Sequence, residues 1–382
     1  MIPLAIPNLA GREADYLQEC VTSTFVSSVG PFVDRFEASV AAAAGAVGGV
    51  AVSTGTAGLH VALRAMGVDR DDLVVLPSLT FIASANAIAY CGAVPWLFDV
   101  DPASLTLDPA RLAAAFEREL RRTKAGPVHR TTGRRVAAAM PVHTLGHPAD
   151  MARIVEFCDR FGVPVVADAA AALGALYRGR PIGDTGAAAS VFSFNGNKVV
   201  TAGGGGAVVS DDQALLDRVR HLSTTARRGP DYDHDEVGFN YRLTNVQAAV
   251  GCAQMEQLDD FVATKRRIQA HYTDQLADLP GFTPIPQASW AQSSCWFAGF
   301  LLDGWRPEQC DALRTRLRRA DVDARPFWKP MHLQRPYRDS PHEALSVTED
   351  LWPRVLTLPC STNITDEQLA LVVAAVRREV AA

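Results

Sequence analysis

The 382-residue sequence has no apolar run that reaches membrane-spanning length without a glycine, a proline or a charge. Its N-terminal stretch, MIPLAIPNLAGRE, holds two prolines and no long apolar segment, so it is not expected to be a signal peptide. The seven cysteines include no C-x-x-C pair and are odd in number, which argues against a disulfide framework and a zinc site. These absences favour a cytoplasmic protein with reduced thiols.

The chain also lacks a strong charge of either sign. Its 37 Lys and Arg and 42 Asp and Glu give a net charge of -5, and the basic residues are spread along the sequence. The one dense basic run, Arg118–Lys124, ends an amphipathic helical segment and is most simply a solvated face. This composition argues against a nucleic-acid partner and against binding to a membrane surface.

Short apolar runs alternate with longer helical patterns over the first two thirds of the chain. The runs are apolar throughout, which is typical of strands covered by helices on both faces. The sequence therefore predicts an α/β fold with a mostly parallel seven-stranded sheet flanked by helices. The seven expected strands are Gly49–Ser53, Leu73–Pro77, Val94–Val100, Val136–Val142, Val163–Asp168, Ser190–Phe194 and Gly206–Ser210, and the helices between them include 58–66, 81–91 and 150–161.

The pattern changes near residue 245. One long helix is expected over Asn245–Leu276, and a shorter α/β region follows that ends in a helix over Asp366–Val380. Because a chain of this length exceeds the usual size of a single core, two domains are expected. The prediction is a large α/β domain over residues 1–250 and a smaller C-terminal domain over residues 251–382.

Ligands of such sheets gather at the carboxyl ends of the strands. At one such end, AVSTGTAGLHVALRAM passes from a strand through a Gly/Thr turn into an amphipathic helix. A helix N-terminus presents free N–H groups and a positive dipole end, so the amides around Gly55, Thr56 and Ala57 suit a phosphate. Taken alone, an ordinary N-cap is the simpler explanation of this turn.

Asp168 directly follows another apolar strand. A carboxylate buried there needs a cationic partner, because an unpaired charge is costly to remove from water. A protonated pyridine nitrogen is one such partner, and the carboxylate would keep it protonated. A cap on the following helix is an equally good explanation of Asp168 from this motif alone.

The segment SFNGNKVVTAGGGG places Ser193 at a strand end and Lys198 five residues later. Burial favours the neutral form of lysine, and neutral lysine forms Schiff bases. The glycines that follow, Gly203–Gly206, allow close approach of the backbone. A surface loop is the alternative explanation of Lys198, but its position between two buried strands counts against it.

These features together predict a site for pyridoxal phosphate (PLP). The helix end takes the phosphate, Asp168 keeps the ring nitrogen protonated, and Lys198 carries the cofactor covalently. No one of these motifs specifies the cofactor by itself. Their order and their shared position at strand ends do.

Over essentially its whole length, the sequence resembles the DegT/StrS-type sugar aminotransferases, which are PLP enzymes of fold type I. It looks most similar to the branch that converts nucleotide-linked 4-keto-6-deoxy sugars to 4-amino sugars, including those of bacillosamine and legionaminic acid pathways. SFNGNK, TAGGGG and ARPFWKPMH are especially like that branch. The stretches that match the family are FVSSVGPFVDRFE, STGTAGLHVAL, PSLTFIASANAI, GAVPWLFDVD, PVHTLGHPADM, ADAAAALGALYRGRPIG, SFNGNKVVTAGGGG and GFNYRLTNVQAAVGCAQMEQLD.

The resemblance implies roles for the residues at the strand ends. Lys198 is the Schiff-base lysine and moves a proton between the amino donor and the cofactor. Asp168 pairs with the pyridine nitrogen, and Gly55, Thr56 and Ser193 bind the phosphate.

The resemblance also implies roles for three residues elsewhere. Phe81 stacks on the cofactor ring, although as a bare sequence feature it would be assigned to the core. Asn240, in FNYR, reaches the phosphate of the neighbouring subunit's cofactor, which implies a homodimer with composite active sites. His332 lies near the sugar, and a structural or surface histidine is the alternative.

Three further positions complete the comparison with the family. His143 and His147 have i, i+4 spacing, but Gly146 and Pro148 exclude a helical metal pair, so both are expected to be structural and no metal is expected. The family commonly has Gln or Glu three residues after the aspartate, and this chain has Ala171. A polar contact near the cofactor or the substrate is therefore missing.

The resemblance implies an aminotransferase that moves an amino group from glutamate to a nucleotide-linked 4-ketosugar. A related PLP enzyme that acts on a cyclitol or an aminobenzoate precursor is one alternative. The family's sugar dehydratases have His in place of the Schiff-base lysine, so the intact Lys198 disfavours a dehydratase. The third alternative is a non-catalytic regulator that binds PLP, but such proteins carry an added DNA-binding domain, which this sequence does not show.

Overall fold

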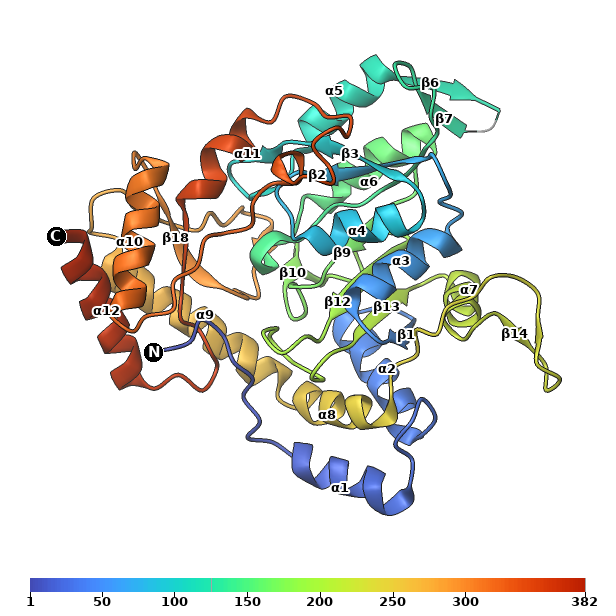
Figure 1. Ribbon diagram of the computed structural model, residues 1–382, viewed down its shortest axis with the longest axis horizontal. Helices are drawn as coiled ribbons and strands as arrows, with labels where there is room; N and C mark the ends of the chain where they lie inside the picture. The colour runs from blue at the N-terminus through green and yellow to red at the C-terminus, as the bar shows by residue number, and fades with distance from the viewer. Residues whose placement is uncertain (125, 382) are drawn as a thin grey trace.

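The computed structural model describes residues 1–124 and 126–381, with a central sheet between two layers of helices (Figure 1). Its seven main strands are β1 (Gly48–Val52), β2 (Leu73–Pro77), β3 (Val94–Phe98), β8 (Val136–Ala139), β9 (Val166–Asp168), β12 (Ala189–Ser193) and β13 (Gly206–Ser210). Their order is β1-β13-β12-β9, continued by β8-β2-β3 through the parallel bridges Ala139–Val165 and Val142–Asp168. Among these seven strands, β13 alone runs in the opposite direction to the other six. The mostly parallel seven-stranded sheet is confirmed.

Helices cover both faces of this sheet. They are α2 (Pro31–Ala44), α3 (Gly55–Ala65), α4 (Ile82–Tyr90), α5 (Pro109–Glu119), α6 (Met151–Phe161), α7 (Gln213–Ser223) and α8 (Asn245–Met255). Alternate strand residues face two separate apolar clusters. In β2, Val74 and Leu76 pack with side chains of α3, α4 and α7, whereas Leu73 and Val75 face the cluster that includes α2, α5, α6 and α8. Burial on both faces is the reason that the strands are apolar throughout.

The prediction of one long helix over residues 245–276 is wrong, because the structure has two helices there. The first, α8, ends at Met255, and α9 (Leu258–Leu276) begins after Gln257, whose φ of -110° and ψ of 6° are not helical. The two helices pack in different places: α8 lies against α1 (Glu13–Ser23) and α2, and the end of α9 enters a separate C-terminal cluster. No proline or glycine marks this change of direction at residues 256–257, so no local pattern predicts it.

The C-terminal region has a small antiparallel sheet, β16-β18-β19, packed with α9, α10 (Pro307–Arg319) and α12 (Asp366–Ala381). Its strands are β16 (Phe282–Pro284), β18 (Ala298–Leu302) and β19 (Val355–Leu358). The N-terminal segment lies against this region, as Figure 1 shows, because the Cys360 N–H donates to the Leu4 carbonyl at 2.8 Å. The predicted boundary at residue 250 falls inside α8, and the division into domains 1–250 and 251–382 stays a prediction.

The remaining elements are short. Across the described residues, no helix combines the length and the apolar character that crossing a membrane requires. The short elements are β4 (Val100–Asp101), β5 (Thr106–Leu107), β6 (Leu120–Thr123), β7 (Gly126–His129), β10 (Leu176–Tyr177), β11 (Arg180–Pro181), β14 (Arg227–Arg228), β15 (Asp233–His234), β17 (Ala291–Gln292) and α11 (Ser346–Leu351).

Candidate active site

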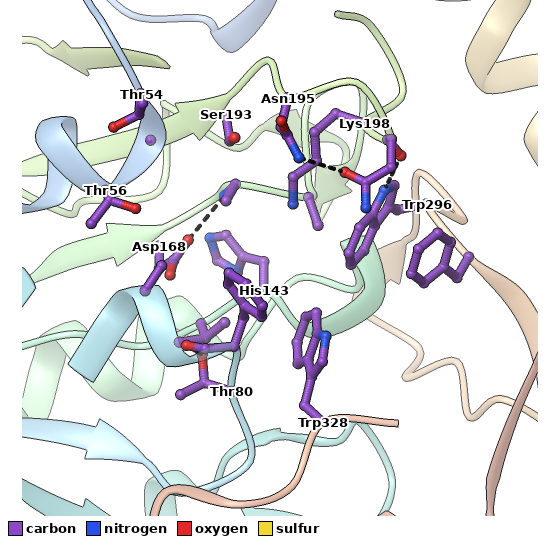
Figure 2. A pocket seen from close by; sticks show the side chains of 18 of the residues that line it. Thr54, Thr56, Thr80, His143, Asp168, Ser193, Asn195, Lys198, Trp296 and Trp328 are labelled. Carbon is purple, nitrogen blue, oxygen red and sulfur yellow. Dashed lines mark hydrogen bonds between the residues drawn. The ribbon is translucent and has the colours of Figure 1, made fainter. Parts of the chain in front are cut away.

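A cavity of about 450 Å³ lies at the carboxyl ends of β1, β9 and β12, where the sequence predicts the site. The N-terminus of α3, the loops after β2 and β12, and residues 325–328 of the C-terminal region line it. Figure 2 shows side chains from these segments pointing toward one another. The structure brings together six of the predicted site residues here: Gly55, Thr56, Phe81, Asp168, Ser193 and Lys198.

Lys198 comes from the loop between β12 and β13, and its side chain lies beside Trp296 (Figure 2). Its Nζ is 3.9 Å from the centre of the Trp296 ring, and the indole N–H donates to the Asn197 carbonyl at 2.6 Å. Burial lowers the pKa of Lys198 to about 8, although the charge of Asp168 acts in the opposite direction. A lysine with this pKa supplies neutral, nucleophilic amine near neutral pH.

Asp168 ends β9, and both of its carboxylate oxygens accept hydrogen bonds. The Ser84 hydroxyl donates to Oδ2 at 2.7 Å, and the Ala170 N–H donates to Oδ1 at 3.1 Å. Burial raises the pKa of Asp168, while these two bonds and the charge of Lys198 lower it. Residues 169–175 form turns and no helix, so Asp168 is not a helix cap. A buried carboxylate that faces a cavity suits a cationic ligand atom.

The turn after β1 presents the predicted phosphate-binding amides of Gly55 and Thr56, but the amide of Ala57 is not available. The Thr54 hydroxyl is the N-cap of α3 and accepts the N–H of Ala57 at 3.0 Å, so the Ala57 amide is already used within the protein. The amides of Gly55 and Thr56 belong to the first turn and have no partner within the helix. A Cβ at Gly55 would lie 2.8 Å from the Cβ of Ser193, so glycine allows the helix end to approach Ser193.

His332 is not in the cavity. Its Nδ1 is 2.7 Å from the Ser78 hydroxyl, and its Nε2 is 3.2 Å from the Glu349 carboxylate. The structure therefore does not bring His332 together with the predicted site residues. Its contacts fit the structural alternative.

Asn240 is also outside the cavity that holds the Lys198 of its own chain. It is exposed and lines a second hollow of about 730 Å³ together with Arg220 and Arg242. Its backbone pairs with Thr224 in an antiparallel bridge. Asn240 is therefore not among the residues that line the cavity of Lys198 in the same chain.

The sequence analysis missed an aromatic wall of the cavity. Trp328 lies between Phe81 and Trp296, with ring centres 5.8 and 5.7 Å away, and it stacks on Phe327 at 4.7 Å. Figure 2 shows Trp296 beside Lys198 and Trp328 below Trp296. The tryptophans lie about a hundred residues or more beyond Lys198 in the sequence, and no local pattern links them to it.

The two histidines expected to be structural make structural hydrogen bonds. His143 accepts the Ala149 N–H at Nδ1, and His147 accepts the Ala288 N–H at Nε2, both at 3.0 Å. Burial lowers the pKa of His143 to about 3 and that of His147 to about 4, so both rings are neutral. His143 also lines the cavity, which the sequence did not indicate.

Ala171 lines the cavity, and it offers no polar side chain there. Its carbonyl accepts the Ser294 hydroxyl at 2.9 Å, so its backbone is held by the C-terminal region. The departure from the family at this position therefore lies in the site itself.

These residues fit PLP. The close approach of Gly55 to Ser193 leaves a cradle for a phosphate, the buried Asp168 suits a protonated ring nitrogen, and Lys198 is a buried amine of lowered pKa. When bound, PLP supplies an electron sink for the carbon that loses its proton.

Residues 7–377 match the DegT/DnrJ/EryC1/StrS aminotransferase family. The chain belongs to this family. It is therefore an enzyme, an aminotransferase that uses PLP as its cofactor.

Named relatives and solved structures resemble the chain over nearly its whole length. GDP-perosamine synthase of Caulobacter vibrioides is 38% identical over 381 residues, which cover 98% of this chain and 97% of that protein. DesI, solved in the presence of its TDP-sugar product, is 31% identical with a TM-score of 0.86 over 99% of this chain and 92% of DesI. 3-Amino-5-hydroxybenzoic acid synthase is 28% identical with a TM-score of 0.86 over 99% of both chains. These similarities confirm fold type I.

Proposed function

We propose that this aminotransferase moves the amino group of glutamate to a nucleotide-linked 4-keto-6-deoxy sugar. The donor leaves as a keto acid, and the sugar C4 carbonyl becomes an amine. The cavity itself carries this proposal, because it joins an aromatic wall to a fixed cation. The names of GDP-perosamine synthase and of the DesI complex support a nucleotide sugar as the substrate.

The fixed cation is Arg325. Its guanidinium donates to both carboxylate oxygens of the buried Asp323, with Nη2 2.8 Å from Oδ2 and Nε 3.0 Å from Oδ1. Asp323 also accepts the Leu4 N–H. Among the described residues that line the cavity, Lys198 and Arg325 are the two Lys or Arg side chains. An oriented guanidinium suits a phosphate or a carboxylate, and both proposed substrates carry such groups.

Each of the residues that line the cavity has its own role in the proposed reaction. Lys198 would hold the cofactor covalently, and as a free amine it would carry the proton that leaves Cα of the donor and the proton that the sugar carbon gains. Asp168 would hold the ring nitrogen in its protonated form. Trp296 and Trp328 offer flat apolar faces to the C–H side of a sugar ring and exclude water from the amine, and Phe81, beside Trp328, would stack on the cofactor ring.

A related activity is the second candidate. The aromatic wall also suits a planar ring, and the similarity to 3-amino-5-hydroxybenzoic acid synthase favours an aminobenzoate precursor as the alternative substrate class. A cyclitol is a further alternative. A role as a non-catalytic regulator has no support from the family, which is one of aminotransferases.

A substrate panel tests the proposal. The purified protein with PLP and glutamate is incubated with nucleotide-linked 4-ketosugars, the corresponding free sugars, a keto-cyclitol and a cyclic keto precursor of an aminobenzoate. We expect a product whose mass shows an amine in place of the ketone from the nucleotide sugars, with kcat/KM about a hundredfold or more above that of the free sugar, because contacts with the nucleotide are lost. Equal efficiency on the free sugar, or turnover of a non-sugar substrate alone, would contradict the proposal.

We also propose that the enzyme is a cytoplasmic homodimer with composite sites. Asn240 is exposed and lines a hollow separate from the cavity of its own chain, which leaves its side chain free to serve another chain's cofactor. Phe25 and Val29 line the same hollow and are 47% and 56% exposed, which is the kind of apolar surface that a second chain covers. A two-fold axis would then give two equivalent sites.

Mixing two inactive variants tests the composite site. Lys198→Ala and Asn240→Ala are each expected to be poorly active as homodimers. A mixed dimer has one site with both lesions and one with neither. Because random exchange makes about half of the dimers mixed, about one quarter of all sites should be wild type and activity should partly return.

The matched control mixes Lys198→Ala with Asp168→Asn. Both residues line the cavity of the same chain, so every site in that mixture keeps one lesion and no activity should return. If subunit exchange is verified and the Asn240 mixture also stays inactive, Asn240 does not serve the partner's site.

A further inference from the structure

Two buried hydroxyl groups lie in a row behind the carboxylate of Asp168. Ser84, in the first turn of α4, donates to Asp168 Oδ2 at 2.7 Å. The Thr80 hydroxyl lies 2.8 Å from the Ser84 hydroxyl, and neither side chain is exposed to solvent. The row Thr80, Ser84, Asp168 thus joins the end of β2 to the end of β9. Figure 2 shows Thr80 below Asp168.

Counting hydrogens fixes the direction of this row. A serine hydroxyl has one hydrogen, and a carboxylate attracts it more strongly than a neutral oxygen does. With Asp168 ionised, Ser84 therefore gives its hydrogen to Oδ2 and accepts the hydrogen of Thr80. The other acceptor in reach of both hydroxyls is the Phe81 carbonyl, which is 3.2 Å from Ser84 Oγ and 3.4 Å from Thr80 Oγ1.

We propose that Thr80 and Ser84 act as a pair of positioning residues that keep Asp168 ionised and oriented toward the ring nitrogen of PLP. The inference rests on the PLP dependence of the enzyme, and it is independent of which sugar is the substrate. Neither residue touches the reacting atoms. Both act through Asp168.

The charges around Asp168 explain why this help is needed. Burial disfavours the ionised carboxylate, and the hydrogen bonds from Ser84 and Ala170 and the cation of Lys198 oppose that effect. His143 also lines the cavity, but its own burial keeps it neutral, so it adds no positive charge. The hydroxyl of Ser84 is therefore one of the groups that hold Asp168 in its ionised form.

The same segment also fixes Phe81. The Ser84 N–H donates to the Phe81 carbonyl at 3.2 Å, and Thr80 precedes Phe81 directly. Phe81 is the N-cap residue of α4 and makes no side-chain cap of its own. Thr80 and Ser84 thereby connect the residue expected to stack on the ring with the residue expected to hold its nitrogen.

The test measures cofactor binding with two ligands: PLP and its 1-deaza analogue, in which carbon replaces the ring nitrogen. For Ser84→Ala, we expect the Kd of PLP for the cofactor-free protein to rise about tenfold, the low end of what a lost hydrogen bond to a charged group gives. The Kd of the analogue should stay the same or fall, because the analogue has no nitrogen for Asp168 to hold. A general loss of structure would weaken both ligands equally.

Companion variants sharpen the result. Ser84→Thr keeps a hydroxyl and should restore PLP binding, and Thr80→Val should show the same selective loss as Ser84→Ala with a smaller factor. Ser190→Ala is the matched control, because its buried hydroxyl donates to the Ile182 carbonyl and lies apart from the cavity lining. It should change neither Kd.

Each outcome decides the proposal. A loss for PLP that the analogue does not share, with rescue by Ser84→Thr, supports it. Equal weakening of both ligands, or unchanged PLP binding in Ser84→Ala, overturns it. If Ser84→Ala does not fold, the same comparison of ligands is made with Thr80→Val, which keeps the shape of the side chain.

Discussion

Lys198→Ala is expected to abolish transamination and to leave the fold intact. Turnover should fall by at least about 10⁴-fold, the upper range for a lost acid–base group, because the variant loses covalent attachment as well as the proton carrier. The visible absorbance of bound PLP should disappear. Initial rates with the best substrate of the panel and the spectrum of the reconstituted protein measure both effects.

The thermal stability of the cofactor-free variant gives an independent check. The folded pKa of Lys198 is about 8, below its ordinary value of 10.5, so the unfolded chain binds more protons between these two pH values and the buried charged lysine destabilises the fold at neutral pH. Below about pH 8 that penalty is fully present, and it disappears as the pH rises toward 10.5. Lys198→Ala should therefore have a Tm at pH 7 equal to or above that of the wild type.

Lys265 is the matched control, since it is buried but has a structural role. Its Nζ donates to the carbonyls of Cys360 at 2.6 Å and Trp296 at 3.1 Å. Lys265→Ala removes the lysine donor from both carbonyls and leaves the Trp296 carbonyl with the Cys360 thiol, 3.6 Å away, so the variant should lose about 1–3 kcal/mol of stability for an unsatisfied buried carbonyl. A Lys198→Ala variant that keeps turnover, or that unfolds as Lys265→Ala does, contradicts the role of Lys198.

Asp168→Asn is expected to keep PLP bound but to lower kcat by about 10²- to 10³-fold, the size of a lost preorganised electrostatic contact. The amide oxygen can still accept the Ala170 N–H, and the amide nitrogen can donate to the Ser84 oxygen, so the shape of the site is preserved. A neutral amide cannot hold the ring nitrogen in its protonated form, and the electron sink is weakened. The kcat and the PLP content of the purified variant measure the two effects separately.

Asp150→Asn serves as its control. Asp150 is also buried and accepts the Tyr177 hydroxyl, but it lies outside the cavity lining. This variant should lose stability and keep its kcat once folded. If Asp168→Asn turns over at nearly the normal rate, the carboxylate is needed only for the local turn.

The sequence by itself determined the sheet and the residues at its carboxyl edge. Strands buried on both faces leave uninterrupted apolar runs, and β2 and β13 have the bounds that their sequences indicated. Because the carboxyl ends of parallel strands meet at one edge, Gly55, Asp168 and Ser193 could be placed together from their positions after β1, β9 and β12. The same reasoning brought Lys198 to that edge. All of these features depend on residues close together in the chain, so they can be recognised in the sequence.

Only the tertiary structure decided which other side chains meet there. Ser84 and Asp168 are 84 residues apart, and Trp296 and Asn197 are 99 apart. In the structure, the Ala57 N–H donates to the Thr54 hydroxyl, and His332 lies outside the cavity beside Ser78. The expected long helix is interrupted before Leu258, because Gln257 is not helical. These outcomes depend on how separate elements pack against one another. Such packing leaves no periodic pattern along the chain, so these contacts between distant residues could not be predicted from the sequence.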